Sequence, residues 1–117
     1  MKHGGIKVDA VKKEVIELVH KELESANKKF PMFKSMHEGY AVLKEEVEEA
    51  KDDMEWCEEK LKCALELIKK NDDVALQEVE FLKEFAVSGA IELIQVAAMA
   101  QKFIDSKGDH DESTGLY

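Results

Sequence analysis

The chain has 117 residues, with 17 lysines and no arginine against 26 aspartates and glutamates, and its formal net charge is −9. Helix formers such as Glu, Lys, Ala and Leu are abundant, which indicates one all-α domain and argues against a parallel-sheet enzyme. The lysines are interleaved with acids instead of forming a basic cluster. Since phosphate neutralisation needs clustered cations, we expect no nucleic-acid partner.

Targeting and cysteine patterns point to an intracellular protein. Residues 1–7 lack the apolar core of a signal peptide, and no stretch of about 20 residues is uncharged. Cys57 and Cys63 lie six positions apart in a helical stretch, so their side chains point to different faces and cannot form a disulfide or a zinc site. We expect a cytoplasmic, soluble protein with no membrane partner.

The first predicted helix covers residues 8–29 and follows a flexible leader of residues 1–7. Its apolar side chains recur at spacings of three and four residues among Lys and Glu, as in an amphipathic helix. Pro31 then interrupts the pattern because proline disfavours helical geometry at the residue before it and has no backbone N–H. The apolar segment 30–33 is expected to pack onto the core.

The second predicted helix begins at Ser35, because Ser35 and Glu38 have the spacing of a capping box. Residues 71–73 end this helix, and a bend or break near residues 53–56 is left open. Apolar residues form one stripe along it, taken as the core direction: Leu43, Val47, Ala50, Met54, Cys57, Leu61, Leu65 and Ile68.

The third predicted helix covers residues 74–104, with one of the aspartates before it as the N-cap. From residue 85 to 101 it is apolar almost all round, which predicts a place in the bundle centre or in an oligomer interface. The polar segment 106–117 is expected to be a disordered tail. The sequence thus predicts an antiparallel bundle of three long helices over residues 8–105.

Acidic residues on the second helix form the first candidate site. Glu46, Glu49 and Asp53 lie along one edge of the apolar stripe, whereas Glu48 and Asp52 point away. Like charges held this close destabilise a helix unless a cation lies between them. The alternative is a solvated acidic face, which is what most acidic runs are.

Glu92 is the second candidate, because it is the only ionisable residue between residues 85 and 101. A lone carboxylate on an apolar helix is costly to bury, and packing of the two helices would bring it towards Glu46 and Glu49. Converging carboxylate oxygens form the ligand set of a hard divalent cation such as Mg²⁺. An ion pair between Glu92 and a lysine of a neighbouring helix is the alternative.

Residues 33–104 resemble the MazG-like, all-α nucleoside triphosphate pyrophosphohydrolase superfamily, and relatives of the phage type look most similar. The resemblance is carried by HEGYAVLKEEVEEAKDD at residues 37–53 and by GAIELIQVAAMAQKF at residues 89–103. The family motif EExxE matches Glu45, Glu46 and Glu49. The later family motif ExxD matches only in part, because Glu92 is followed by Gln95 where the family has an aspartate.

The resemblance implies a Mg²⁺-dependent enzyme, with Mn²⁺ as a second usable ion, that converts a ribo- or deoxynucleoside triphosphate to the monophosphate and pyrophosphate. It also implies a homodimer or homotetramer in which helices of neighbouring subunits frame the site. The implied metal ligands are Glu46, Glu49, Glu92 and, as a weak fourth, Gln95. Glu45 is the candidate base and Asp53 a spare acid; the candidate substrate contacts are His37, Lys34, Lys44 and Lys60.

Two other functions remain open at this point. The first is a catalytically silent homologue that binds a nucleotide or a metal ion, because the neutral amide of Gln95 lowers the charge available to a cation. The second is a helical protein-interaction module whose acidic face is only solvated.

Overall fold

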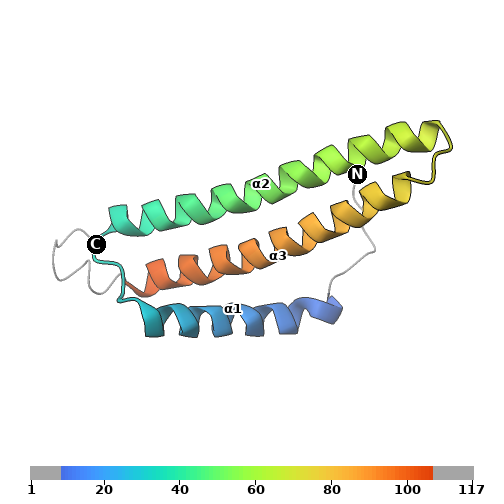
Figure 1. Cartoon of the computed structure of the whole chain (residues 1–117). Helices are drawn as coiled ribbons and strands as arrows, with labels where there is room; N and C mark the ends of the chain where they lie inside the picture. Colours follow the sequence, from blue (N-terminus) through green and yellow to red (C-terminus); the bar gives the residue numbers. More distant parts are fainter. Residues whose placement is uncertain (1–8, 107–117) are drawn as a thin grey trace.

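The computed structural model describes residues 9–106, which form three helices: α1 (Asp9–Lys29), α2 (Met36–Lys69) and α3 (Ala75–Asp105). Helices α2 and α3 run antiparallel along their whole length, and α1 lies on the other side of α3, so that α3 is central (Figure 1). The all-α prediction is confirmed, and no strand occurs in the range described. Residues 1–8 and 107–117, with the predicted leader and most of the predicted tail, lie outside that range.

The start of α2 confirms that Ser35 caps the helix, but the Glu38 carboxylate accepts from a different backbone amide than the one a capping box predicts. The Glu38 amide donates to Ser35 Oγ at 3.1 Å, which satisfies one of the free amides of the first turn. The Glu38 carboxylate accepts from the Lys34 amide at 2.6 Å, one residue earlier than in a standard capping box. The segment 34–38 therefore fixes the direction in which α2 leaves the linker.

Helix α2 is continuous through residues 53–56, so the helix has no break there. Its acidic middle has partners on α3 that keep it helical. Ser88 Oγ donates to Asp53 Oδ2 at 2.9 Å, and the ring of Trp56 stacks on Phe85 with centroids 5.5 Å apart.

The turn between α2 and α3 contains Asn71 with a φ of 54°, a left-handed conformation that Asn tolerates better than most residues. Asp72 Oδ1 accepts from the Val74 amide at 3.0 Å, and Asp72 O accepts from the Ala75 amide at 3.1 Å. The N-cap of α3 is Val74, which makes no side-chain cap bond. The predicted aspartate cap is therefore wrong, because Asp72 closes the turn instead of capping the helix.

The linker before α2 packs against the end of α3 and covers one end of the bundle. Phe33 is buried and its ring meets Phe103 edge-on at 6.5 Å, which confirms that the linker packs onto the core. The Phe33 amide donates to Ser106 Oγ at 3.0 Å, and Ser106 Oγ donates to Lys102 O at 2.8 Å. Ser106 is fully buried, so the tail prediction is wrong at its first residue.

Small side chains form the centre of the α2–α3 contact. Ala50, Ala64 and Ala98 are buried, whereas Val47 and Met54 of the predicted core stripe are 49% and 60% exposed. The apolar stripe of α2 is therefore wider than the surface that α3 covers. The alanines let the two helices approach closely, and only the edge of the stripe that carries them is buried.

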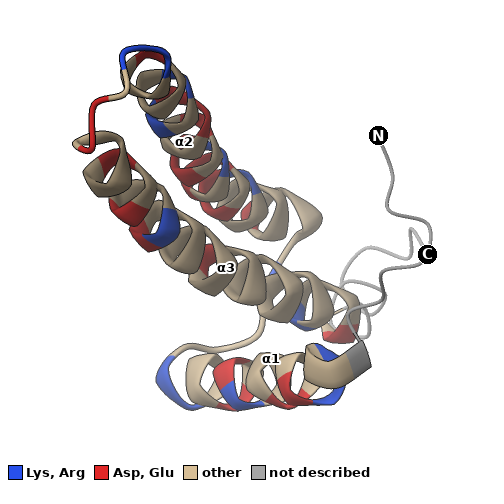
Figure 2. Cartoon of the chain, turned by 90° about the vertical axis from the view of Figure 1, so that its right-hand side faces the viewer, with Lys and Arg blue, Asp and Glu red and all other residues tan. Residues whose placement is uncertain are grey.

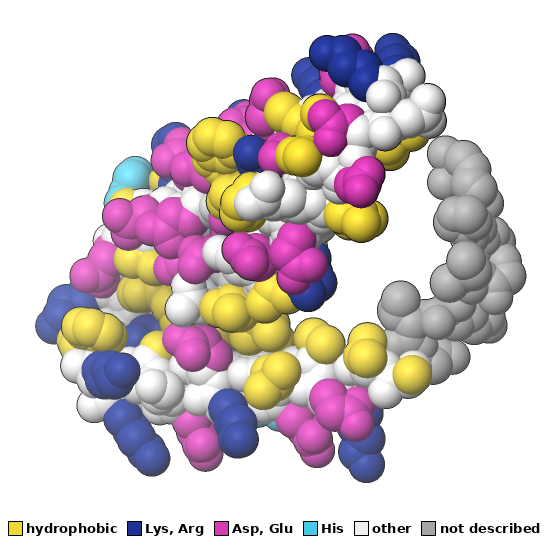
Figure 3. Space-filling view, turned by 45° about the vertical axis from the view of Figure 1, so that its right-hand side comes forward, with side chains coloured by type: hydrophobic (Ala, Val, Ile, Leu, Met, Phe, Trp, Pro, Cys, Tyr) yellow, Lys and Arg dark blue, Asp and Glu magenta, His cyan; other side chains and the backbone are white. Residues whose placement is uncertain are grey.

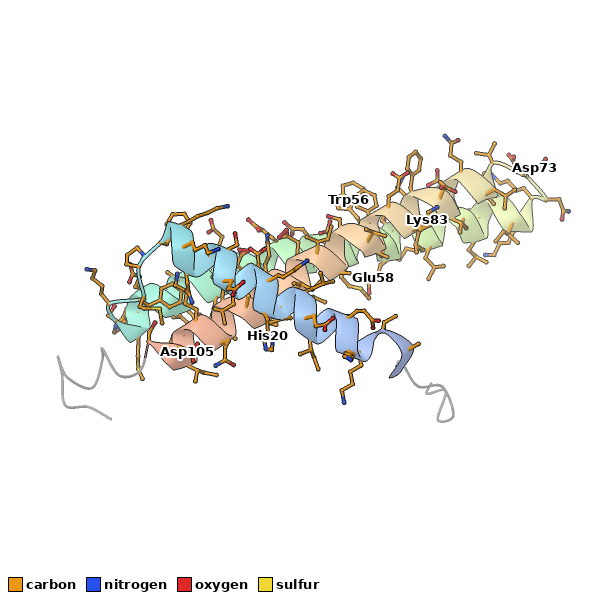
Figure 4. The ribbon with its side chains drawn as sticks, turned by 90° about the horizontal axis from the view of Figure 1, so that it is seen from below. His20, Trp56, Glu58, Asp73, Lys83 and Asp105 are labelled. Carbon is orange, nitrogen blue, oxygen red and sulfur yellow. The ribbon has the colours of Figure 1, made fainter. Side chains whose placement is uncertain are left out.

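Helix α1 crosses only one half of the hairpin made by α2 and α3. The half that carries Asp105 has α1 against it, whereas the half that carries Asp73 and Lys83 extends beyond α1 (Figure 4). Acidic residues are distributed over all three helices with lysines between them (Figure 2). No helix in the described range has the length and apolarity needed to cross a bilayer.

Candidate metal and substrate site

Three carboxylates from two helices converge where α2 and α3 face each other. Glu46 and Glu49 stand one turn apart on α2, and Glu92 comes from the middle of α3. Each offers one oxygen atom, and these atoms all lie within 4.8 Å of one another. The helix pairing thus unites the two sequence candidates, as predicted.

Two oxygens of this group are buried and lack a hydrogen-bond partner: Glu46 Oε1 and Glu92 Oε2. An unsatisfied buried carboxylate oxygen costs free energy, because it has lost its water without gaining a donor. The group has an excess of acceptors and no donor aimed at these atoms. A hard cation with oxygen ligands fits such a set, since it would satisfy both orphaned oxygens and offset the repulsion.

The electrostatics agree with this geometry. A hydrogen bond with Glu49, followed by burial and the charges of Glu49, Glu46 and Asp53, raises the pKa of Glu92 to about 7. Burial, followed by the charges of Glu49, Glu45 and Glu22, also raises the pKa of Glu46. Glu92 therefore keeps a proton to near-neutral pH unless a cation replaces it.

Asp53 lies close to the three carboxylates but has another partner. Its Oδ2 accepts from Ser88 Oγ, and a Cβ placed on Gly89 would lie 3.3 Å from Asp53 Cβ. The absence of a side chain at Gly89 lets α3 come this close to α2. Asp53 thus contributes negative charge near Glu92 without belonging to the converging group.

A cavity of about 480 Å³ opens beside Glu46 between α1, the linker and the α2–α3 pair. Its apolar lining comes mainly from residues 30–33, and its polar lining includes acids of α1 and α2. The cavity is lined by Glu22, Ser25, Ala26, Lys29, Phe30, Pro31, Phe33, Val42, Glu38, Glu45, Glu46, Gln95, Met99 and Lys102. Glu46 belongs to both the cavity and the carboxylate group, so a molecule held in the cavity would lie next to the carboxylates.

Two further predicted residues line this cavity. Glu45 is solvent-exposed on the α2 side, and Gln95 is half-buried one turn after Glu92 on α3. Both therefore line the same cavity as Glu46.

The structure does not bring the predicted substrate contacts to the cavity. His37 and Lys34 are exposed at the start of α2 and do not line it. Lys44 is exposed and pairs with Glu48 of its own helix. Lys60 pairs with Glu78 at 3.2 Å and lies 5.1 Å from the centre of the Phe81 ring, in the half of the hairpin that α1 leaves uncovered.

The sequence interpretation missed two lysines of the cavity. Lys29 ends α1, and Lys102 is 1% exposed with its Nζ donating to Phe30 O at 3.3 Å. Burial lowers the pKa of Lys102, and the nearby charge of Glu38 opposes this shift. Lys102 lies seven residues after Gln95, which places both on one side of α3; this spacing was the signal available in the sequence.

Comparison of the chain with family models, curated proteins and solved structures gave no match.

Proposed function

We propose that the chain is a Mg²⁺-dependent nucleotide pyrophosphohydrolase of the MazG-like kind, with a ribo- or deoxynucleoside triphosphate as substrate. The observation that carries the proposal is the convergence of Glu46, Glu49 and Glu92, with two buried carboxylate oxygens that lack donors. The two sequence motifs of the resemblance fall on the helices that supply these residues.

Glu46, Glu49 and Glu92 would hold the cation, and the amide oxygen of Gln95 would add a neutral ligand. A bound Mg²⁺ supplies charge neutralisation on phosphate oxygens and lowers the pKa of coordinated water. Mn²⁺ takes the same oxygen ligands and would replace it.

The other groups around the cavity have distinct roles in this proposal. Glu45 is exposed beside Glu46, so its carboxylate is free to accept the proton of the attacking water. Lys29 at the end of α1 would attract the phosphate chain, and the apolar lining of the cavity would shelter the nucleoside. Attack on the α-phosphoryl group releases pyrophosphate and leaves the nucleoside monophosphate.

The second candidate is a MazG-like protein that binds nucleotide and metal without turnover. Gln95 favours it, because an amide in the place of the family aspartate contributes no negative charge to the cation. A protein-interaction module with a solvated acidic face is less well supported, since Glu46 Oε1 and Glu92 Oε2 are buried.

The test is product analysis with a panel of ribo- and deoxynucleoside triphosphates and Mg²⁺ or Mn²⁺, distinguishing pyrophosphate from orthophosphate. We expect pyrophosphate from the wild type, none from Glu46→Gln, and unchanged release from the matched control Glu48→Gln, whose side chain pairs with Lys44 away from the site. Failure to release pyrophosphate from every nucleotide, with metal-dependent nucleotide binding retained, would favour the silent homologue. Equal activity of Glu46→Gln would contradict the site.

A further inference from the structure

Lys102 is the one buried lysine among residues 9–106. On the face drawn in Figure 3, by contrast, acidic side chains spread across the middle and most lysines lie at the margin. Lys102 Nζ donates to Phe30 O at 3.3 Å and lies 5.3 Å from the centre of the Phe33 ring. It forms no ion pair with a carboxylate of the described residues, and a buried charge without such a partner costs free energy. An ammonium has three N–H donors, so Lys102 keeps donors for a further acceptor.

The register of α2 against α3 fixes where Lys102 lies in the cavity. Asp53 bonds to Ser88, and Gly39 lies against the ring of Phe103. These two contacts are separated by nearly the same number of residues on each helix, so α2 and α3 keep one antiparallel register between them. Lys102 precedes Phe103, which places it beside the start of α2 and far from the carboxylate group.

The cavity therefore has three zones along its length. At the carboxylate end Glu46 lies opposite Gln95, and in the middle the half-buried side chains of Val42 and Met99 form apolar walls. Lys102 lies at the far end. It follows Gln95 by seven residues, or about 10 Å along α3 at about 1.5 Å per residue, a span that a nucleoside covers.

The order of the zones matches the order of groups in a nucleotide whose phosphates lie at the carboxylate end. The sugar and base then lie between the apolar walls, and the outer edge of the base reaches Lys102. Uracil, thymine and guanine have an exocyclic carbonyl oxygen on that edge, where cytosine and adenine have an amino group. An ammonium only donates hydrogen bonds, so it pairs with the carbonyl and leaves the amino group without an acceptor.

We propose that Lys102 selects nucleotides of uracil, thymine or guanine, by donating a hydrogen bond from Nζ to the exocyclic carbonyl oxygen of the base. The inference rests on the proposed function for the position of the phosphates, but it does not require turnover. Glu38 also lines the cavity, and its charge acts on Lys102. Its carboxylate is an acceptor for the ring N–H that lies beside the carbonyl in these three bases.

A purely structural role for Lys102 makes a different prediction. The bond from Lys102 Nζ to Phe30 O ties the linker to α3, and the linker forms one wall of the cavity. Loss of that bond alone would weaken the binding of every nucleotide by the same factor. Loss of a donor to the base would instead change the ratio of affinities between the carbonyl and the amino bases. The ratio is therefore the readout that separates the two roles.

The test is isothermal titration calorimetry of the full chain with Mg²⁺ and five nucleoside monophosphates, which carry uracil, thymine, guanine, cytosine or adenine. We expect the wild type to bind the first three at least about tenfold more tightly than the last two. Lys102→Met keeps a long side chain and a good helix former but no donor, and it should bring the ratio to within about twofold of one. Lys102→Gln keeps a donor for Phe30 O, yet its amide also offers an oxygen to amino bases, so this variant should lose the preference as well.

The matched control is Lys29→Met, which removes the other lysine of the cavity. It should weaken all five nucleotides alike and leave the ratio unchanged, because Lys29 faces the phosphates in the proposed function. Circular dichroism checks that each variant keeps its helices.

The outcomes separate this inference from the proposed function. Equal affinity of the wild type for all five nucleotides, or a preference that survives both Lys102 variants, overturns the inference and leaves the proposed hydrolase standing. Equal weakening of all five by both Lys102 variants assigns the residue a structural role and also overturns it. Absence of binding by every nucleotide overturns both proposals. The expected preference without release of pyrophosphate supports the inference in a silent homologue.

Discussion

Glu92 on α3 faces Glu49 on α2 with carboxylate oxygens within 4.8 Å of each other, although 43 residues separate the two in the chain. This contact is the largest cause of the rise in the pKa of Glu92 to about 7. The Glu92 carboxyl therefore holds a proton at a pH at which an exposed glutamate has lost it. A proton and a divalent cation compete for the same oxygens, and this competition gives the site a measurable pH dependence.

The first prediction concerns stability against pH in the absence of metal. The pKa of Glu92 is higher in the folded than in the unfolded chain, so the folded state loses stability as pH rises from about 4.5 to about 7 and regains none above it. Glu92→Gln removes this loss. The variant should be more stable than the wild type by roughly 1–2 kcal/mol at pH 8 and equally stable at pH 4.

Urea unfolding at both pH values, with chelator and at one protein concentration, measures this difference. Glu48→Gln is the control, because the Glu48 carboxyl lies outside the carboxylate group and the side chain pairs with Lys44. If the wild type is as stable as Glu92→Gln at pH 8, then Glu92 does not face the other carboxylates in the folded protein.

The second prediction concerns Gln95, which lines the cavity one turn after Glu92. Gln95→Asp adds a charged oxygen ligand and should tighten Mg²⁺ binding by about tenfold, or 1.4 kcal/mol. It should also destabilise the metal-free protein at neutral pH, because a further negative charge joins the group. Isothermal titration calorimetry measures the affinity, and an unchanged value would place the residue 95 side chain outside the coordination sphere.

The third prediction concerns Gly39, which allows the end of α3 to close against α2. A Cβ at this position would overlap the Phe103 ring and lie 3.2 Å from Phe33 Cδ2. Gly39→Ala should therefore destabilise the fold by about 1–3 kcal/mol, although alanine favours a helix. Thermal unfolding tests this, with Gly89→Ala as the comparison because its Cβ meets only Asp53 Cβ. A loss at Gly39 no larger than that at Gly89 would contradict the packing described.

The fourth prediction concerns Ser106, whose hydroxyl joins the Phe33 amide to the Lys102 carbonyl. Ser106→Ala leaves a buried amide without its acceptor and should cost about 1–3 kcal/mol. Ser88→Ala breaks an exposed bond to Asp53 and should cost less than about 1 kcal/mol. Denaturant midpoints of the two variants compare the two bonds, and equal losses of stability would argue against a special role for the end of α3.

Local patterns in the sequence predicted the three helices and the acids that meet. The capping spacing of Ser35 and Glu38 placed the start of α2, and the isolation of Glu92 among apolar residues marked it as a partner for Glu46 and Glu49. Both signals depend on short-range chemistry, which the sequence carries directly.

Features that depend on how helices pack were not predictable in this way. The stripe with Val47 and Met54 had the periodicity of a core, yet the close approach at Ala50 leaves both residues half-exposed. The cavity and the burial of Lys102 depend on where α1 crosses α3, and no spacing within one helix encodes that crossing.

The central claim is that Glu46, Glu49 and Glu92 form one divalent-cation site from two helices. Electron paramagnetic resonance of Mn²⁺ titrated into the protein tests it without any need for turnover. We predict one bound ion per chain in the wild type and in Glu48→Gln, and binding at least about tenfold weaker in Glu46→Gln and in Glu92→Gln. Equal Mn²⁺ binding by all four proteins, or none by the wild type, would contradict the claim.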